Sequence, residues 1–160
     1  MSQLRPGAPA PDFELPDDGG TRHRLSAQRP RPVVVYFYPK DDTPGCTTEA
    51  CGFRDANEEI RALGVEVWGV SPQDERSHAR FREKYGLNFT LLADVDHAVA
   101  EAYGVWTEKT RYGRTYWGIA RTTFLIDGEG RIARIWEQVR PEGHAEEVLA
   151  ELRGLLATPA

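Results

Sequence analysis

The sequence contains little cysteine, no long apolar run and no excess of basic charge. Two cysteines in 160 residues are too few for a disulfide-rich scaffold. No segment approaches the roughly 20 apolar residues of a membrane helix. Residues 1–13 hold three prolines and no apolar signal core. We therefore expect a cytoplasmic protein with no membrane partner.

The charge balance argues against nucleic-acid binding. There are 20 Lys and Arg against 25 Asp and Glu, which gives a net charge of −5, and the basic residues form no run. Apolar residues make up 40% of the chain and charged residues 28%, as in globular rather than disordered proteins. We expect residues 1–160 to form a single domain with a real core.

The pattern of apolar residues predicts alternating strands and helices after an N-terminal β-hairpin at 12–25. Residues 33–38 form a continuous β-branched and aromatic run, which is typical of a central strand covered on both faces. Further strands are expected at 65–70, 89–93, 122–126 and 131–136, and helices at 43–63, 74–85, 97–103 and 145–156. This order predicts an α/β fold with a central mixed sheet flanked by helices, similar to a thioredoxin-like fold.

Cys46 lies about three residues into the first long helix, directly after the central strand. Thr43 is a good N-cap and Pro44 fits the first helical position. The partial positive charge of a helix N-terminus favours a thiolate there, at the sheet edge where open α/β folds bind ligands. The alternative is that Cys46 is a small buried hydrophobe, as many free cysteines are.

Cys51 follows five residues later in the same expected helix. Helix geometry separates such Cα atoms by about 8.7 Å. A disulfide needs roughly 4.4 to 6.8 Å. The two cysteines can therefore bond only if the first helical turns unwind, which Gly45 and Gly52 would ease. The alternative is that Cys51 is an unrelated core residue.

A lowered thiol pKa alone supplies little rate. At pH 7 a fall in pKa from about 8.5 to about 6 raises the thiolate fraction about 30-fold. A thiolate of lower pKa is also a weaker nucleophile, which lowers the rate about 10- to 18-fold, so the net gain in rate is about two- to threefold. A fast thiol enzyme must also stabilise the transition state. The candidates near Cys46 are the N–H groups of Gly45 and Cys46, the Thr43 hydroxyl and a cation from elsewhere in the chain.

Residues 39–46, Pro-Lys-Asp-Asp-Thr-Pro-Gly-Cys, match the Pro-x-x-x-Thr-x-x-Cys motif of the peroxiredoxins. Residues 47–55, Thr-Thr-Glu-Ala-Cys-Gly-Phe-Arg-Asp, resemble the branch called bacterioferritin comigratory protein or peroxiredoxin Q. The resemblance covers almost the whole chain. It includes segments 7–13, 69–71, 103–106 and 121–127.

The resemblance implies a thiol peroxidase that reduces hydrogen peroxide and organic hydroperoxides without a cofactor or metal. Cys46 would attack the peroxide and become a sulfenic acid. Cys51 would resolve it as an intramolecular disulfide, and thioredoxin or glutaredoxin would reduce that disulfide. The branch also implies a monomer.

The resemblance assigns further roles around Cys46. Thr43 would hydrogen-bond the thiolate and the peroxide, and Pro39 would shield the sulfenic acid from solvent. Arg121 would lower the thiol pKa and orient the peroxide, so that Thr43, Gly45, Cys46 and Arg121 line the substrate site. The alternatives are an ordinary surface ion pair for Arg121, a strand terminator for Pro39 and a plain N-cap for Thr43, the last being compatible with catalysis.

Two features stay open at this point. Glu49 matches the branch pattern but is equally well a solvated helix carboxylate. Trp106, Tyr116 and Trp117 precede Arg121 and are expected in the core, although they could line an apolar mouth for organic peroxides.

Three other functions fit the sequence less well. Disulfide reductases use Cys-x-x-Cys and place a cis-proline before the strand at 122–126, whereas this chain has four residues between its cysteines and has Ala120 and Arg121 at that place. A zinc module needs closely spaced ligands. The histidines are instead widely separated, at His23, His78, His97 and His144. Nothing in the sequence favours an inactive scaffold, because the motif positions are all filled.

Overall fold

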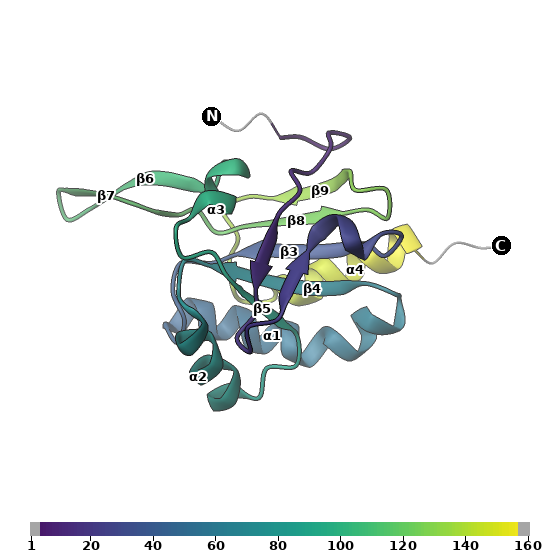
Figure 1. Cartoon of the computed structure of the whole chain (residues 1–160), viewed down its shortest axis with the longest axis horizontal. Helices are drawn as coiled ribbons and strands as arrows, with labels where there is room; N and C mark the ends of the chain where they lie inside the picture. The colour runs from purple at the N-terminus through teal and green to yellow at the C-terminus, as the bar shows by residue number, and fades with distance from the viewer. Residues whose placement is uncertain (1–3, 157–160) are drawn as a thin grey trace.

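A five-stranded mixed sheet forms the centre of the computed structural model, which describes residues 4–156 (Figure 1). Its strand order is β5-β4-β3-β8-β9, built from β3 (Val33–Phe37), β4 (Glu66–Ser71), β5 (Thr90–Ala93), β8 (Thr122–Ile126) and β9 (Ile132–Trp136). Strands β3, β4 and β5 run parallel, and β8 pairs antiparallel with both β3 and β9. The predicted mixed sheet is confirmed.

Helices and a small hairpin cover the two faces of this sheet. On one face lie α1 (Pro44–Ala62), α2 (Glu75–Tyr85) and α4 (His144–Leu156). On the other lie α3 (Ala98–Ala102), the 3₁₀ helix η1 (Leu25–Gln28) and the predicted N-terminal hairpin of β1 (Glu14–Pro16) and β2 (Arg22–Arg24). The layers agree with the predicted thioredoxin-like α/β fold.

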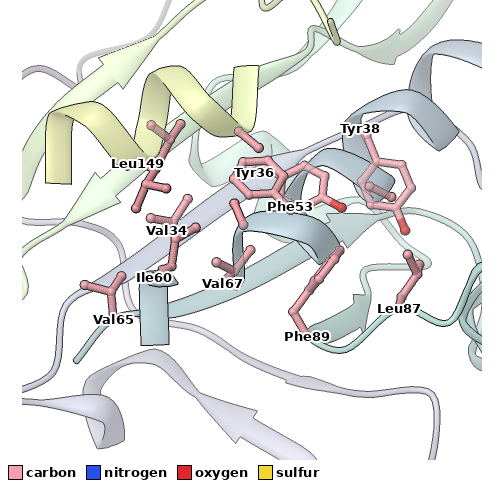
Figure 2. Close-up of a cluster of buried hydrophobic side chains, with 14 of the residues drawn as sticks. Val34, Tyr36, Tyr38, Phe53, Ile60, Val65, Val67, Leu87, Phe89 and Leu149 are labelled. Atoms are coloured by element: carbon pink, nitrogen blue, oxygen red, sulfur yellow. The ribbon is translucent and has the colours of Figure 1, made fainter. Parts of the chain in front are cut away.

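Strand β3 is buried at all five of its positions, as its continuous apolar run predicts. Alternate side chains point to opposite faces of a strand. Val34 and Tyr36 therefore join the cluster under α1 and α4 (Figure 2), whereas Val35 and Phe37 join the cluster on the other face. The central strand delivers the chain into the loop that precedes α1.

The ends of the helices follow local chemistry. Helix α1 ends at Ala62, two residues before Gly64, whose φ of 82° suits a glycine. Helix α2 begins after Asp74, whose side chain accepts a hydrogen bond from the Ser77 N–H. Within residues 4–156, no helix has both the length and the apolar composition to cross a membrane.

Residues 106–119 form a hairpin that the apolar pattern does not predict, made of β6 (Trp106–Arg111) and β7 (Arg114–Ile119). It projects from the body of the molecule (Figure 1). Tyr116 and Trp117 are 45% and 57% exposed, so the expectation of a core position is wrong for both. The reason is that no other part of residues 4–156 covers the outer part of the hairpin. Trp106, at the base, stacks on the ring of His97 with centroids 3.9 Å apart.

Candidate active site

Cys46 is the third residue of α1 and lies just beyond the end of β3. Its side chain is buried, with 1% of the residue exposed. The first N–H groups of a helix have no intrahelical acceptor, and their partial positive charge acts on the Cys46 sulfur. The predicted placement of this thiol at a helix N-terminus is therefore confirmed.

Thr43 occupies the N-cap position with an extended backbone, at φ −99° and ψ 155°. Its side chain does not cap the helix, contrary to the expectation from its residue type. The hydroxyl instead donates to the carbonyl oxygen of Lys40 at 2.8 Å. Because the hydroxyl proton is used there, Thr43 does not donate to the Cys46 sulfur, and the expected hydrogen bond from Thr43 to the thiolate is wrong for this arrangement. The oxygen keeps its lone pairs for a donor that arrives beside Cys46.

Arg121 reaches the thiol from the far end of the chain. Strand β8 pairs with β3 so that Thr122 lies opposite Phe37, which places the start of β8 beside the end of β3. Nη2 of Arg121 donates to the Cys46 sulfur at 3.3 Å. The Arg121 side chain is 17% exposed, so the alternative of an ordinary surface ion pair is wrong.

Glu49 shares this guanidinium with Cys46. It lies three residues after Cys46 and therefore on the same face of α1. Its Oε1 accepts from Nη1 of Arg121 at 2.7 Å, and its side chain is fully buried. Burial raises the pKa of Glu49 to about 7, against the opposing effect of the Arg121 charge. The interpretation of Glu49 as a solvated helix carboxylate is wrong.

Lys109 is a second cation near the thiol, and the sequence gives no signal for it because it lies on the unpredicted hairpin. It pairs with Tyr116 across β6 and β7. Partial burial, together with the like charge of Arg121, lowers the pKa of Lys109, while the charge of Cys46 opposes the shift. Lys109 and Arg121 are therefore two positive charges that act at the Cys46 site.

Gly45 lies where α1 and Arg121 approach each other closely. A Cβ atom on Gly45 would lie 3.2 Å from Nη2 of Arg121 and 3.4 Å from Cγ of Pro141. Any larger residue would press on the nitrogen that contacts the sulfur. The structure thus brings Gly45, Cys46 and Arg121 together, as the sequence predicts.

The two cysteines are both free thiols, Cys46 buried and Cys51 half-buried. They lie on one unbroken helix, so forming a disulfide requires the start of α1 to unwind. Pro39 is half-buried in the loop after β3, and its carbonyl oxygen lies 3.5 Å from the Ser71 hydroxyl. Within residues 4–156, no group of three or more His, Cys, Asp or Glu side chains is arranged to hold a metal ion.

Known proteins are similar to this chain in sequence and in fold. The model of the AhpC/TSA family matches residues 6–135. The chain is 47% identical to peroxiredoxin Bcp of Bacillus subtilis over 149 residues, which span 93% of this chain and 95% of the relative. It is 46% identical to peroxiredoxin Bcp of Escherichia coli over 153 residues, 96% of this chain and 98% of the relative.

Solved structures of a bacterioferritin comigratory protein and of a peroxiredoxin Q have a fold similar to that of this chain. The bacterioferritin comigratory protein of Xanthomonas campestris, studied for its alkyl peroxide reduction activity, superposes with a TM-score of 0.87 at 39% identity and covers 98% of this chain and 99% of its own. A cysteine-to-serine variant of peroxiredoxin Q from Xylella fastidiosa gives a TM-score of 0.92 at 37% identity and covers 97% and 99%.

Proposed function

The chain belongs to the AhpC/TSA family, in its Bcp or peroxiredoxin Q branch, and from this premise we propose a two-cysteine peroxidase cycle in which Cys46 reacts with the peroxide. Membership of this branch makes the protein a thiol peroxidase. The proposal concerns which residues perform the cycle, and how. In this proposal the substrates of the enzyme are hydrogen peroxide and organic hydroperoxides, and the enzyme acts as a monomer without a cofactor.

In the first step the Cys46 thiolate attacks one oxygen of the peroxide. An S–O bond forms as the O–O bond breaks, the sulfur becomes a sulfenic acid, and the departing oxygen takes up a proton as water or an alcohol. Negative charge moves from sulfur to the departing oxygen during this step. The Arg121 guanidinium, 3.3 Å from the sulfur, and the N–H groups of Gly45 and Cys46 are the donors that stabilise this charge.

Thr43 and Pro39 complete the peroxide site in this proposal. The Thr43 hydroxyl donates to the Lys40 carbonyl, which leaves its oxygen free to accept the O–H of a hydroperoxide. Pro39 closes the mouth of the site at the end of β3 and shields the sulfenic acid. Fixing the peroxide between Thr43 and Arg121 aligns its O–O bond with the sulfur.

In the second step the Cys51 thiol attacks the Cys46 sulfur. An S–S bond forms, the S–O bond breaks and water leaves. The helical spacing requires the first turns of α1 to unwind before this attack. A dithiol protein such as thioredoxin or glutaredoxin then reduces the disulfide by thiol exchange and becomes oxidised itself.

The observation that carries this function is the Nη2–Sγ contact of 3.3 Å between Arg121 and Cys46. The test is to mix the fully reduced protein with one equivalent of hydrogen peroxide, follow tryptophan fluorescence in stopped flow and weigh the product. We expect a reaction far faster than that of free cysteine and a product that has lost two hydrogens. An ordinary thiol rate with an unchanged mass would overturn the proposal.

A further inference from the structure

Two neighbouring carboxylates, Asp41 and Asp42, tie the loop before Cys46 to α2. Asp41 accepts from the Ser77 hydroxyl at 2.7 Å and contacts Nδ1 of His78 at 2.7 Å. Asp42 accepts from Lys84 and Tyr85 near the other end of the same helix. The loop that carries Pro39 and Thr43 is thus fastened to α2 at two places, and α1 begins directly after it.

The Asp41 attachment is almost entirely buried. The side chains of Asp41 and His78 are 3% and 0% exposed. Asp41 also accepts from the Tyr38 hydroxyl at 2.6 Å, and Nε2 of His78 lies 2.9 Å from the Leu92 carbonyl oxygen. A carbonyl only accepts, so Nε2 carries a proton there. Buried hydrogen bonds of this kind are difficult to break, because each broken partner loses its bond without gaining water.

The Asp42 attachment holds a strained backbone. Asp42 has φ 57°, in the left-handed region that most residues with a side chain avoid and that Asp adopts occasionally. The ammonium of Lys84 is 2.8 Å from one carboxylate oxygen, and the Tyr85 hydroxyl is 2.6 Å from the other. These contacts stabilise the loop in this conformation.

The attachments end where the unwinding of α1 must begin. Resting on the function proposed above, we propose that Asp41 and His78 are positioning residues whose buried link to α2 holds the loop at 39–43. This link favours the helical form of the segment that carries Cys46 over the unwound form. It thereby limits the rate at which Cys51 resolves the sulfenic acid. Asp42 assists from the surface. Because Asp41 contacts α2, the residues that limit the rate of disulfide formation include residues of α2, outside the peroxide site itself.

The control has a chemical consequence. The Cys46 sulfenic acid either condenses with Cys51, releasing water, or meets a second peroxide, which adds an oxygen to the sulfur and leaves a sulfinic acid and water. A tighter attachment of the loop to α2 lengthens the lifetime of the sulfenic acid and favours its reaction with a second peroxide. Loosening it favours the disulfide.

The test variant is Asp41→Asn, which keeps the shape of the side chain and removes the negative charge that faces His78. Quenched samples after one equivalent of hydrogen peroxide are weighed over time, which separates sulfenic acid from disulfide. We expect disulfide formation to become about tenfold faster, because the unwound form gains population. The peroxide step stays within about twofold, because the helical form remains the major one.

Two further variants keep the test decisive. Ser77→Ala removes only one hydrogen bond to Asp41 and serves if Asp41→Asn does not fold; we expect about a two- to threefold acceleration. Leu152 lies on α4 and takes part in neither attachment, so Leu152→Ala weakens the hydrophobic cluster under α1 and α4 without altering Asp41 or Asp42. Its disulfide rate stays at the parent value.

If Asp41→Asn folds and forms the disulfide at the parent rate, the proposal is overturned. If Asp41→Asn does not fold, a parent-like disulfide rate in Ser77→Ala overturns it. So does an equal acceleration in Leu152→Ala, because the effect would then reflect general stability. The parent protein separates this failure from that of the proposed function. If the parent itself forms no disulfide, the assignment of Cys51 is wrong, whereas a normal parent with unresponsive variants removes only the control by α2.

Discussion

The guanidinium of Arg121 lies 2.7 Å from the carboxylate of Glu49, and the same group reaches the Cys46 sulfur at 3.3 Å. Because Glu49 is fully buried, this ion pair has little access to screening water. One nitrogen of the planar fork is fixed by the carboxylate, which directs the other at the sulfur. Glu49 therefore orients the cation that the thiol needs.

The first prediction concerns this cation. We expect Arg121→Ala to slow the peroxide step by about 100-fold or more, because a lowered thiol pKa alone accounts for only a few-fold of rate. Stopped-flow mixing with hydrogen peroxide measures the step. Arg134→Ala is the control, since Arg134 pairs with Glu151 on the surface. A loss of only two- to threefold in Arg121→Ala would mean that Arg121 does not stabilise the transition state.

The second prediction separates the two cysteines. We expect Cys51→Ser to react with one equivalent of peroxide at the parent rate but to lose steady-state turnover with thioredoxin, because the sulfenic acid has no partner. Mass spectrometry should show Cys46 carrying one added oxygen instead of a loss of two hydrogens. Unchanged turnover in this variant would contradict the resolving role of Cys51.

The sequence predicts most of this architecture because the decisive signals are local. The run at 33–38 is apolar on both faces, and β3 is buried on both faces. Pro44 marks the start of α1 and Gly64 follows its end. The position of Cys46 within the helix follows from these two boundaries alone.

The parts that the sequence does not predict depend on tertiary contacts. The hairpin at 106–119 turns through Tyr112 and Gly113, both at positive φ, without the Asn-Gly or Asp-Gly pair that announces such a turn. The sequence therefore gives no indication that Lys109 lies near the Cys46 site. The burial of Glu49 depends on its partner Arg121, which is 72 residues away. No local pattern distinguishes it from a solvated carboxylate.

The third prediction uses the close approach of Gly45 to Arg121. We expect Gly45→Ala to lower the rate of the peroxide step by about tenfold, because the new methyl group displaces the guanidinium nitrogen that contacts Cys46. Stability is expected to hold or rise by up to about 1 kcal/mol, because alanine favours a helix over glycine. Stopped flow and urea unfolding measure the two quantities. A parent-like rate would show that the exact position of Nη2 does not matter.

The fourth prediction follows from the raised pKa of Glu49, which is about 7 in the folded protein because of burial, against an ordinary value of 4.5. The folded state holds this proton more tightly than the unfolded chain does. The stability that the protonated group supplies is therefore fully present below about pH 4.5 and is lost as the pH rises to about 7. The difference corresponds to roughly 3 kcal/mol in the free energy of unfolding.

Glu49→Gln removes the titration while keeping an acceptor for Arg121. Urea unfolding of the parent and the variant at several pH values between 4.5 and 8 measures the effect. Subtracting the variant's curve cancels the titration of the other groups. We expect the parent to lose free energy of unfolding relative to the variant over this range, and the difference to level off above about pH 7. A difference that does not change with pH would mean that the pKa of Glu49 is the same in the folded and the unfolded protein, with the Arg121 charge cancelling the effect of burial.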